Sequence, residues 1–353
     1  MNMTANTEEG AITLKKFRGC LLGALVGDCL GAPFEEDGTV SKKILQKYFD
    51  KMDDPNFKSP IKKYTDDTAM TKSVAESLIK NVAFVEKDMA KRFVSEYFKE
   101  PRRGYGGSVV DIFNKLKASK LEDIWLPARE QFSGLGSFGN GAAMRVSPIG
   151  LFCCNNKPLL IDLATKTSKL THSNVLGING ANLQALAVQQ SFHMDPKSPV
   201  NVSEFISNLL EEMAKLEGAE DAVRVPDENQ VAYQEQLKQM AELLKKGDVP
   251  NEEVVKVLGN NVLALYSVPT AIYSFLRAQE VVPFIQTEDK FRRIIQYSIS
   301  LGGDTDTIAS MAGAIAGAHL GVEAINQNLL KQCEGVEFVS QLAYELHSVT
   351  FNA

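Results

Sequence analysis

The stretch GGDTDTIASMAGAIAGAHLG, residues 302–321, decides the fold. Between residues 309 and 318 it carries seven Ala and Gly residues. Small side chains let neighbouring backbones approach closely, so the stretch predicts a buried central helix. Its composition also resembles a packing motif of membrane helices, but the segment is too short to cross a bilayer and opens with two aspartates. We therefore expect a helix in a protein core.

The rest of the chain shows the same helical periodicity. From Phe17 to Cys29, apolar residues recur at spacings of three to five, and Gly31 and Pro33 end the pattern. Period-two strands bounded by hairpin turns are absent from the sequence, so we predict an all-α fold, a single compact multi-helix domain. Similar helical patterns cover residues 69–78, 89–98, 176–193, 203–217, 230–246 and 291–299.

The chain shows no linker, repeat or low-complexity tract, so one domain over residues 13–353 is expected after a disordered lead of residues 1–12. The polar segment 218–235 is predicted to be a surface excursion. Residues 1–10 lack the apolar core of a signal peptide, and no apolar run approaches the roughly 18 residues of a membrane span. We predict a soluble, intracellular protein without a membrane partner.

Composition narrows the function classes. Hydrophobic residues make up 44% and charged residues 23% of the chain, which is ordinary for a globular protein. A net charge of -6 argues against a basic surface for nucleic acid, so no direct nucleic-acid binding is expected. The five cysteines are odd in number and match no zinc spacing. They are expected to be buried free thiols in a reducing compartment.

Two acidic clusters lie far apart in the chain, TDDT at residues 65–68 and GGDTDT at residues 302–307. Each opens a helical pattern, so helix capping is one interpretation. A pair of carboxylates with an interposed Thr exceeds what a cap requires. Carboxylate and hydroxyl oxygens suit a hard divalent cation such as magnesium. If the fold brings the clusters together, they would form one metal site.

Other candidates are weak when taken singly. Glu35 follows the end of a helical pattern and could be a solvated loop carboxylate. The loop GLGSFGNG, residues 134–141, could expose backbone N–H groups to phosphate oxygens, or it could be a plain structural loop. His172 could contact a ligand or be a satisfied core residue. Phe132 could stack on a base, although packing is its default role.

Three segments carry a family resemblance. GDCLGAPFE at residues 27–35, TDDT at 65–68 and GGDTDT at 302–307 resemble, in order, the signatures of the ADP-ribosylglycohydrolase (dinitrogenase-reductase-activating-glycohydrolase-like) family. The likeness extends from about residue 17 to residue 346. Residues 104–106, 136–145 and 298–304 look most like the vertebrate type-3 branch. Members of that branch remove ADP-ribose from serine and degrade poly(ADP-ribose) and O-acetyl-ADP-ribose.

The resemblance implies an all-α fold with two Mg2+ ions, for which Mn2+ could substitute. It implies Glu35 as the catalytic glutamate. The implied metal ligands are Glu35, Thr65, Asp66, Asp67, Asp304, Asp306 and Thr307. The implied substrate-binding residues are Asp66, Gly104, Gly106, Phe132, Leu135, Gly136, Ser137, Phe138, Gly139, Asn140, Gly141, His172 and Val262. Phe138 departs from the pattern, because Tyr is expected there and its hydroxyl donor is missing.

We therefore expect a magnesium-dependent hydrolase that cleaves the C1″ glycosidic bond of ADP-ribose on serine, with Glu35 as general acid/base. Alternatives are the arginine branch of the family, a metal-dependent phosphohydrolase and a catalytically silent ADP-ribose-binding module. A purely structural scaffold would leave both acidic clusters unexplained. The expected partners are serine-ADP-ribosylated proteins, poly(ADP-ribose) and O-acetyl-ADP-ribose. A monomer of the DNA damage response is expected, in nucleus and cytoplasm and also in the mitochondrial matrix.

Overall fold

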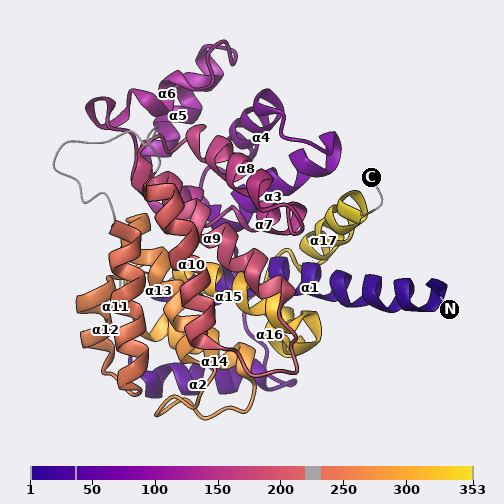
Figure 1. The fold of residues 1–353 in the computed structure, drawn as a ribbon, viewed down its shortest axis with the longest axis vertical. Coiled ribbons are helices and arrows are strands. Elements are labelled where there is room, and N and C mark those ends of the chain that lie inside the picture. The colour runs from indigo at the N-terminus through magenta and orange to yellow at the C-terminus, as the bar shows by residue number, and fades with distance from the viewer. Residues whose placement is uncertain (1, 36–37, 219–231, 352–353) are drawn as a thin grey trace.

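The computed structural model describes residues 2–35, 38–218 and 232–351 (Figure 1). Over these residues the regular elements are helices, and no β-strand occurs. Two isolated bridges join Lys62 to Cys333 and Gly139 to Leu263. The predicted all-α class is confirmed. The predicted excursion at 218–235 falls largely on residues 219–231, which lie outside the described part of the chain.

The helices follow one another with short connections. Their bounds are α1 Asn2–Gly31, η1 Ala32–Phe34, α2 Lys42–Asp53, α3 Asp66–Asn81, α4 Glu86–Lys99, α5 Gly107–Ala118, α6 Leu126–Arg129, η2 Gln131–Gly134, η3 Asn140–Ala142, α7 Ser147–Phe152, α8 Lys157–Lys169, α9 Val175–His193, α10 Val202–Glu217, α11 Ala232–Lys246, α12 Asn251–Leu258, α13 Ala264–Arg277, α14 Lys290–Ser300, α15 Thr305–Leu320, η4 Val322–Ala324, α16 Gln327–Lys331 and α17 Val336–Phe351. Each helical pattern predicted from the sequence corresponds to one of these helices.

Helix α15 lies at the centre of the molecule and runs antiparallel to α1, from the opposite end of the chain (Figure 1). Glycines on α1 recur every four residues and face the small residues of α15. A Cβ built on Gly19 would overlap the carbonyl oxygen of Gly317, and one on Gly27 would overlap that of Ala309. The two backbones are therefore in direct contact, as the small residues predicted.

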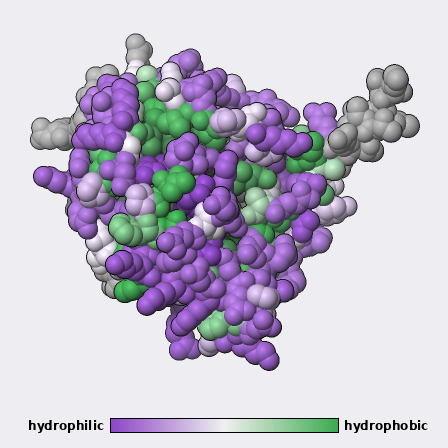
Figure 2. Space-filling view, turned by 90° about the horizontal axis from the view of Figure 1, so that it is seen from below, coloured by the Kyte–Doolittle hydropathy of each residue, from purple (hydrophilic) through white to green (hydrophobic). Residues whose placement is uncertain are grey.

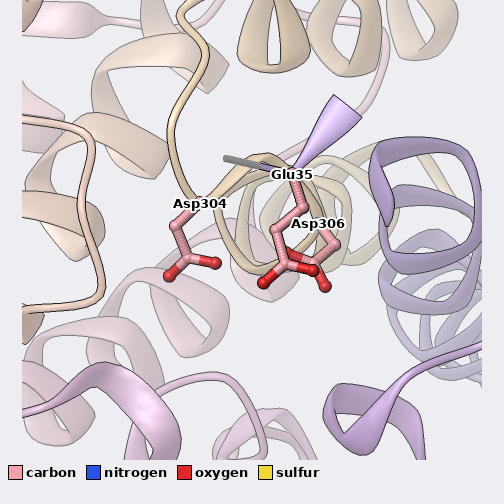
Figure 3. Close-up of side chains that lie close together, drawn as sticks. All are labelled: Glu35, Asp304 and Asp306. Atoms are coloured by element: carbon pink, nitrogen blue, oxygen red, sulfur yellow. The ribbon is translucent and has the colours of Figure 1, made fainter. Parts of the chain in front are cut away.

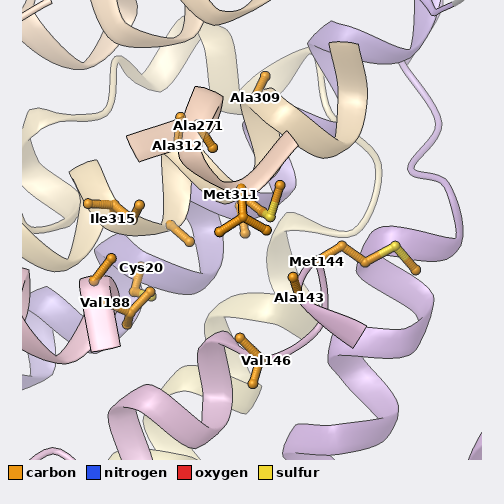
Figure 4. Packing of buried hydrophobic residues seen from close by; sticks show 14 of the residues in the cluster. Cys20, Ala143, Met144, Val146, Val188, Ala271, Ala309, Met311, Ala312 and Ile315 are labelled. Carbon is orange, nitrogen blue, oxygen red and sulfur yellow. The ribbon is translucent and has the colours of Figure 1, made fainter. Parts of the chain in front are cut away.

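The core surrounds this helix pair. Helices α9, α13 and α14 pack on α15, and Figure 4 shows Cys20 of α1 close to Ile315 of α15 within the apolar cluster. The side chains of α15 from Thr305 to His319 are buried. All five cysteines are free and buried, which confirms the predicted burial of free thiols. Close packing in this region fixes where α15 begins, and therefore where its acidic residues lie.

Helix α1 differs from the sequence predictions in two ways. It is helical from Asn2, where a disordered lead was predicted, because a helix propagates cheaply from a packed segment. Residues Glu9–Phe34 are also long and apolar enough, by length and composition alone, to cross a membrane, although no span was predicted. However, 78% of their most apolar stretch is buried inside the protein. Its contact with α15 accounts for this apolar character.

The surface is mainly hydrophilic on the face seen in Figure 2, where hydrophobic side chains form separate groups between polar ones. The last helix, α17, was not predicted from the sequence. It packs on α1 and α3, with Val339, Leu342, Ala343 and Leu346 buried. Both of these partners carry residues of the site described next.

Candidate functional site

Both acidic clusters begin a helix, but they do so in different ways. Thr65 is the N-cap of α3, and its hydroxyl accepts a hydrogen bond from the backbone N–H of Asp67 at 3.3 Å. Asp304 occupies the N-cap position of α15 without a side-chain capping bond. The capping interpretation therefore holds for Thr65 and fails for Asp304. The carboxylate of Asp304 is left available for other contacts.

The fold brings the two clusters together. The Thr307 hydroxyl donates to Oδ2 of Asp67 at 3.0 Å, across 240 residues of chain. Carboxylate oxygens of Glu35, Asp304 and Asp306 lie within 4.8 Å of one another (Figure 3). The condition set by the sequence, one site built from both ends of the chain, is met.

Asp28 is a site residue to which the sequence analysis gave no role. Its fully buried carboxylate accepts hydrogen bonds from the backbone N–H groups of Thr65 at 2.9 Å and Thr68 at 3.1 Å, and from the Thr68 hydroxyl. A side chain of α1 thereby fixes the first turn of α3, where Asp66 and Asp67 lie. The signal was present in the sequence, because Asp28 is part of the segment GDCLGAPFE.

The second cluster depends on two glycines. Gly302 and Gly303 both have φ of +72°, a left-handed conformation that side chains disfavour. A Cβ on Gly303 would overlap the side chain and carbonyl oxygen of Asn260, which accepts from the Asp304 N–H at 2.8 Å. The amide of Asn140 also donates to the Asp304 carboxylate. Asp304 is thus oriented by two separate loops.

Burial makes the carboxylates of this site costly to ionise. It raises the pKa of Asp66 and Asp67 well above the ordinary value, and the Asp306 charge raises both further. The pKa of Asp306 rises to about 7 by burial and by the neighbouring Asp304. Like charges this close are unfavourable without a cation between them.

One oxygen provides a direct test of whether this donor set fits a metal. Oδ1 of Asp67 is buried, and no described residue hydrogen-bonds to it. A buried carboxylate oxygen without a partner is expected to have a ligand. Together with the other carboxylates, it gives the oxygen-rich donor set that hard divalent cations prefer. The residues therefore fit a metal ion.

The acidic clusters open onto a cavity of about 510 Å³. Most of the predicted site residues line it: Glu35, Asp66, Asp67, Gly104, Gly106, Phe132, Ser137, Phe138, Gly139, Asn140, Gly141, His172, Val262, Asp304, Asp306 and Thr307. The lining also includes residues that were not predicted: Met70, Tyr105, Ser108, Val109, Met144, Arg145 and Leu263. These residues come mainly from α3, α5 and the segment just before α7. The apolar periodicity of the sequence does not indicate which side of these elements faces a ligand.

Three predicted residues lie outside this lining. Thr65 acts as the cap described above. The Leu135 carbonyl accepts from the Asn174 side chain at 3.2 Å, and the Leu135 side chain is 48% exposed. Gly136 lies against Ser173, where a Cβ would clash. The latter two residues shape the loop without facing the cavity.

An aromatic pair lies at the cavity, formed by Phe132, just before the glycine-rich loop, and Phe138 within it. The rings of Phe132 and Phe138 are 5.5 Å apart between centroids and tilted by 34°. Phe132 is 47% exposed and has φ of +48°, an uncommon conformation for an aromatic residue. Backbone bonds between Asn140 and Val262 and between Ala264 and Phe138 fasten the loop to the start of α13. The exposed Phe132 ring thus lies against Phe138, which is held by these bonds, in a geometry suited to stacking.

Comparison with known proteins agrees with this geometry. A match to the family described as ADP-ribosylglycohydrolase spans residues 9–352. The chain is 45% identical to ADP-ribosylhydrolase ARH3 of Mus musculus over 350 residues, which cover 96% of this chain and 93% of that protein. It is 44% identical to ADP-ribosylhydrolase ARH3 of Homo sapiens, with 96% and 94% covered.

A solved structure shares the fold. The structure titled "ADP-ribosylglycohydrolase-related protein complex" superposes with a TM-score of 0.67 at 23% identity, covering 96% of this chain and 99% of that one. At this identity the likeness concerns the fold alone. The family match and the identity to the ARH3 proteins each extend over nearly the whole chain, and therefore the chain belongs to the ADP-ribosylglycohydrolase family.

Proposed function

We propose that this enzyme hydrolyses the C1″ glycosidic bond that joins ADP-ribose to serine in proteins, and that poly(ADP-ribose) and O-acetyl-ADP-ribose are further substrates. Its ARH3 relatives support an ADP-ribosylhydrolase activity. One observation carries the proposal: acidic residues from both ends of the chain and the glycine-rich loop line the same cavity. An acid/base, a metal cage and a cradle for a diphosphate are thus within reach of one ligand.

The proposed ligand lies along the cavity with its adenine at the mouth. The adenine stacks on Phe132, and the tilted Phe138 ring supports that face. Backbone N–H groups of the loop from Ser137 to Gly141 take the diphosphate oxygens. The distal ribose then reaches the acidic end of the cavity, beside Asp304.

At the acidic end, the metal ligands are proposed to be Glu35, Thr65, Asp66, Asp67, Asp304, Asp306 and Thr307. Two magnesium ions, or manganese in their place, would supply a grip on the ribose hydroxyls and a positioned water. Thr65 contributes in this scheme through its side-chain oxygen, which also caps α3. Asp28 holds the α3 ligands in place from behind.

Glu35 is proposed to act as general acid/base at the glycosidic bond. Its carboxylate lies with those of Asp304 and Asp306 but is exposed on the cavity side, where a leaving serine oxygen or a water can reach it. Proton transfer by such a group contributes about 10²–10⁴-fold to a rate. The charge that builds on the sugar in an oxocarbenium-like transition state is stabilised by the neighbouring carboxylates.

The deciding experiment offers peptides ADP-ribosylated on serine, arginine or glutamate, with magnesium and then with EDTA. Release of intact ADP-ribose from serine, lost with EDTA, is the expected result. Release from arginine alone would place the enzyme in the arginine branch. AMP and ribose phosphate as products would indicate a phosphohydrolase. Binding of ADP-ribose without any turnover would indicate a silent binding module. The monomeric state and the nuclear, cytoplasmic and mitochondrial locations stay predictions of the sequence.

A further inference from the structure

A buried arginine of the cavity lining has no carboxylate bonded to it among the described residues. Arg145 is 1% exposed, and its guanidinium lies 4.6 Å from the centre of the Phe93 ring. Nη2 of Arg145 donates to the Thr167 carbonyl at 3.0 Å and to the Thr171 hydroxyl oxygen at 2.7 Å. An arginine can only donate, so Thr171 must accept at this contact.

The proton of the Thr171 hydroxyl therefore needs a hydrogen-bond acceptor of its own. Its oxygen lies 2.7 Å from Nδ1 of His172, and no other acceptor for this hydroxyl occurs among the described residues. Thr171 is 1% exposed, so a proton without an acceptor there would be buried and costly. The buried Thr171 proton has an acceptor only when Thr171 donates to Nδ1.

A donor at Nδ1 fixes the proton of His172 on its other nitrogen. Nε2 faces the cavity and has no hydrogen-bond partner within the described chain. Two glycines leave the space in front of it open. A Cβ on Gly141 would lie 2.9 Å from Cε1 of His172, and one on Gly139 would lie 3.5 Å from Nε2. The Nε2–H group is therefore a donor on the cavity side of the ring.

The surroundings also keep the ring neutral. Burial, together with the positive charge of Arg145, lowers the pKa of His172 to about 3. Burial lowers the pKa of Arg145 to about 9, so the guanidinium stays charged at neutral pH. A neutral imidazole donates a hydrogen bond without adding a charge to the cavity, so its strength does not vary with pH near neutrality.

We propose that Arg145 and Thr171 are positioning residues that hold His172 as a neutral Nε2–H donor to an oxygen of the bound ligand. The hydrogen bonds run from Arg145 to Thr171 and from Thr171 to His172. The ligand group at this point must be an acceptor, such as a phosphate or ribose oxygen. The identity of that ligand rests on the proposed function, whereas the tautomer is a property of the protein alone.

The test has two independent measurements, the 15N chemical shifts of the imidazole in the ligand-free protein and the affinity for ADP-ribose. With four histidines in the chain, His172→Gln identifies the signal. Thr171→Val removes the hydroxyl at nearly constant volume, and Thr171→Ser restores it. Thr165→Val is the matched control, because it removes a hydroxyl of α8, the helix just before Thr171, whose one partner among the described residues is Asn182.

In the wild type, the His172 shifts should show protonated Nε2 and unprotonated Nδ1. Thr171→Val should give mixed tautomers and weaken ADP-ribose binding by about tenfold, the size of one lost hydrogen bond. Thr171→Ser and Thr165→Val should both behave as the wild type. A wild-type ring protonated on Nδ1 would overturn the proposal that Arg145 and Thr171 fix the His172 tautomer. A Thr171→Val protein with unchanged tautomer and affinity would overturn it as well. Failure of the wild type to bind ADP-ribose would instead contradict the proposed function, and the shifts would still decide the tautomer.

Discussion

Glu35 differs from the carboxylates beside it. It is exposed, whereas Asp304 and Asp306 are buried. Glu35→Gln should therefore leave folding and ADP-ribose binding almost unchanged and lower turnover by about 10²–10⁴-fold, the usual contribution of a general acid/base. Calorimetric titration and a peptide-release assay measure the two effects. Wild-type turnover in this variant would remove Glu35 from the chemistry.

A substitution at Asp67 should have opposite effects on the stability of the metal-free protein and on its affinity for magnesium. Asp67→Asn removes one buried charge from a group of like charges but keeps the oxygen that accepts from Thr307. In the metal-free state, the melting temperature should rise by about 2 °C or more. Magnesium affinity should fall at least about tenfold, because the unpartnered Oδ1 loses its charge. A variant that binds magnesium like the wild type would exclude Asp67 as a ligand.

At the scale of elements, the α1/α15 contact should be intolerant of a single methyl group. A Cβ on Gly313 would lie 2.8 Å from the backbone carbon of Gly23. Gly313→Ala should therefore destabilise the protein by about 1–3 kcal/mol through overpacking, despite the better helix propensity of alanine. Gly10→Ala is the matched control on α1, because a Cβ there meets nothing within 4 Å. Denaturant unfolding should show a neutral or slightly stabilising effect for the control; equal losses in both variants would refute the close contact.

The elements differ in how far the sequence predicted them. Periodicity located α10 and α11 within a few residues, since each buries one apolar face, and it located α9 equally well although that helix is buried on nearly all sides. The pairing of α1 with α15 could be predicted only in part. Small residues indicate that a helix packs closely on a neighbour, but they do not identify which helix that neighbour is. Asp28 could not be assigned from periodicity, because its role depends on which helix start lies opposite it. Likewise, the contact between Arg145 and Thr171 arises only because the fold places the segment after α8 beside the segment before α7.

At the scale of the whole molecule, magnesium should stabilise the protein more at high pH. The pKa of Asp306 is raised from 3.8 to about 7, so in the metal-free protein its contribution to stability is complete below about pH 4 and is lost as the pH rises through 7. Cation binding requires the deprotonated form. The increase in melting temperature with magnesium, relative to EDTA, should therefore be larger near about pH 8 than near about pH 6.

The control for this measurement replaces magnesium with sodium at equal ionic strength, which should give no comparable increase at either pH. An increase with magnesium that is equal at both pH values, or larger at the lower one, would contradict a site made of these carboxylates.

The contact between Thr307 and Asp67 has a consequence for biosynthesis. One half of the carboxylate set leaves the ribosome early, and the other half follows 240 residues later. The contact between α1 and α15 spans still more of the chain, 274 residues between Gly31 and Thr305, so folding of the core depends on a late, long-range contact. A chain that stops before residue 302 carries the glycine-rich loop and Glu35 but lacks the second acidic cluster, residues 302–307, and therefore Asp304, Asp306 and Thr307 of the proposed metal ligands. Hydrolase activity should therefore arise only when synthesis is nearly finished, and no shorter fragment should possess a partial form of it.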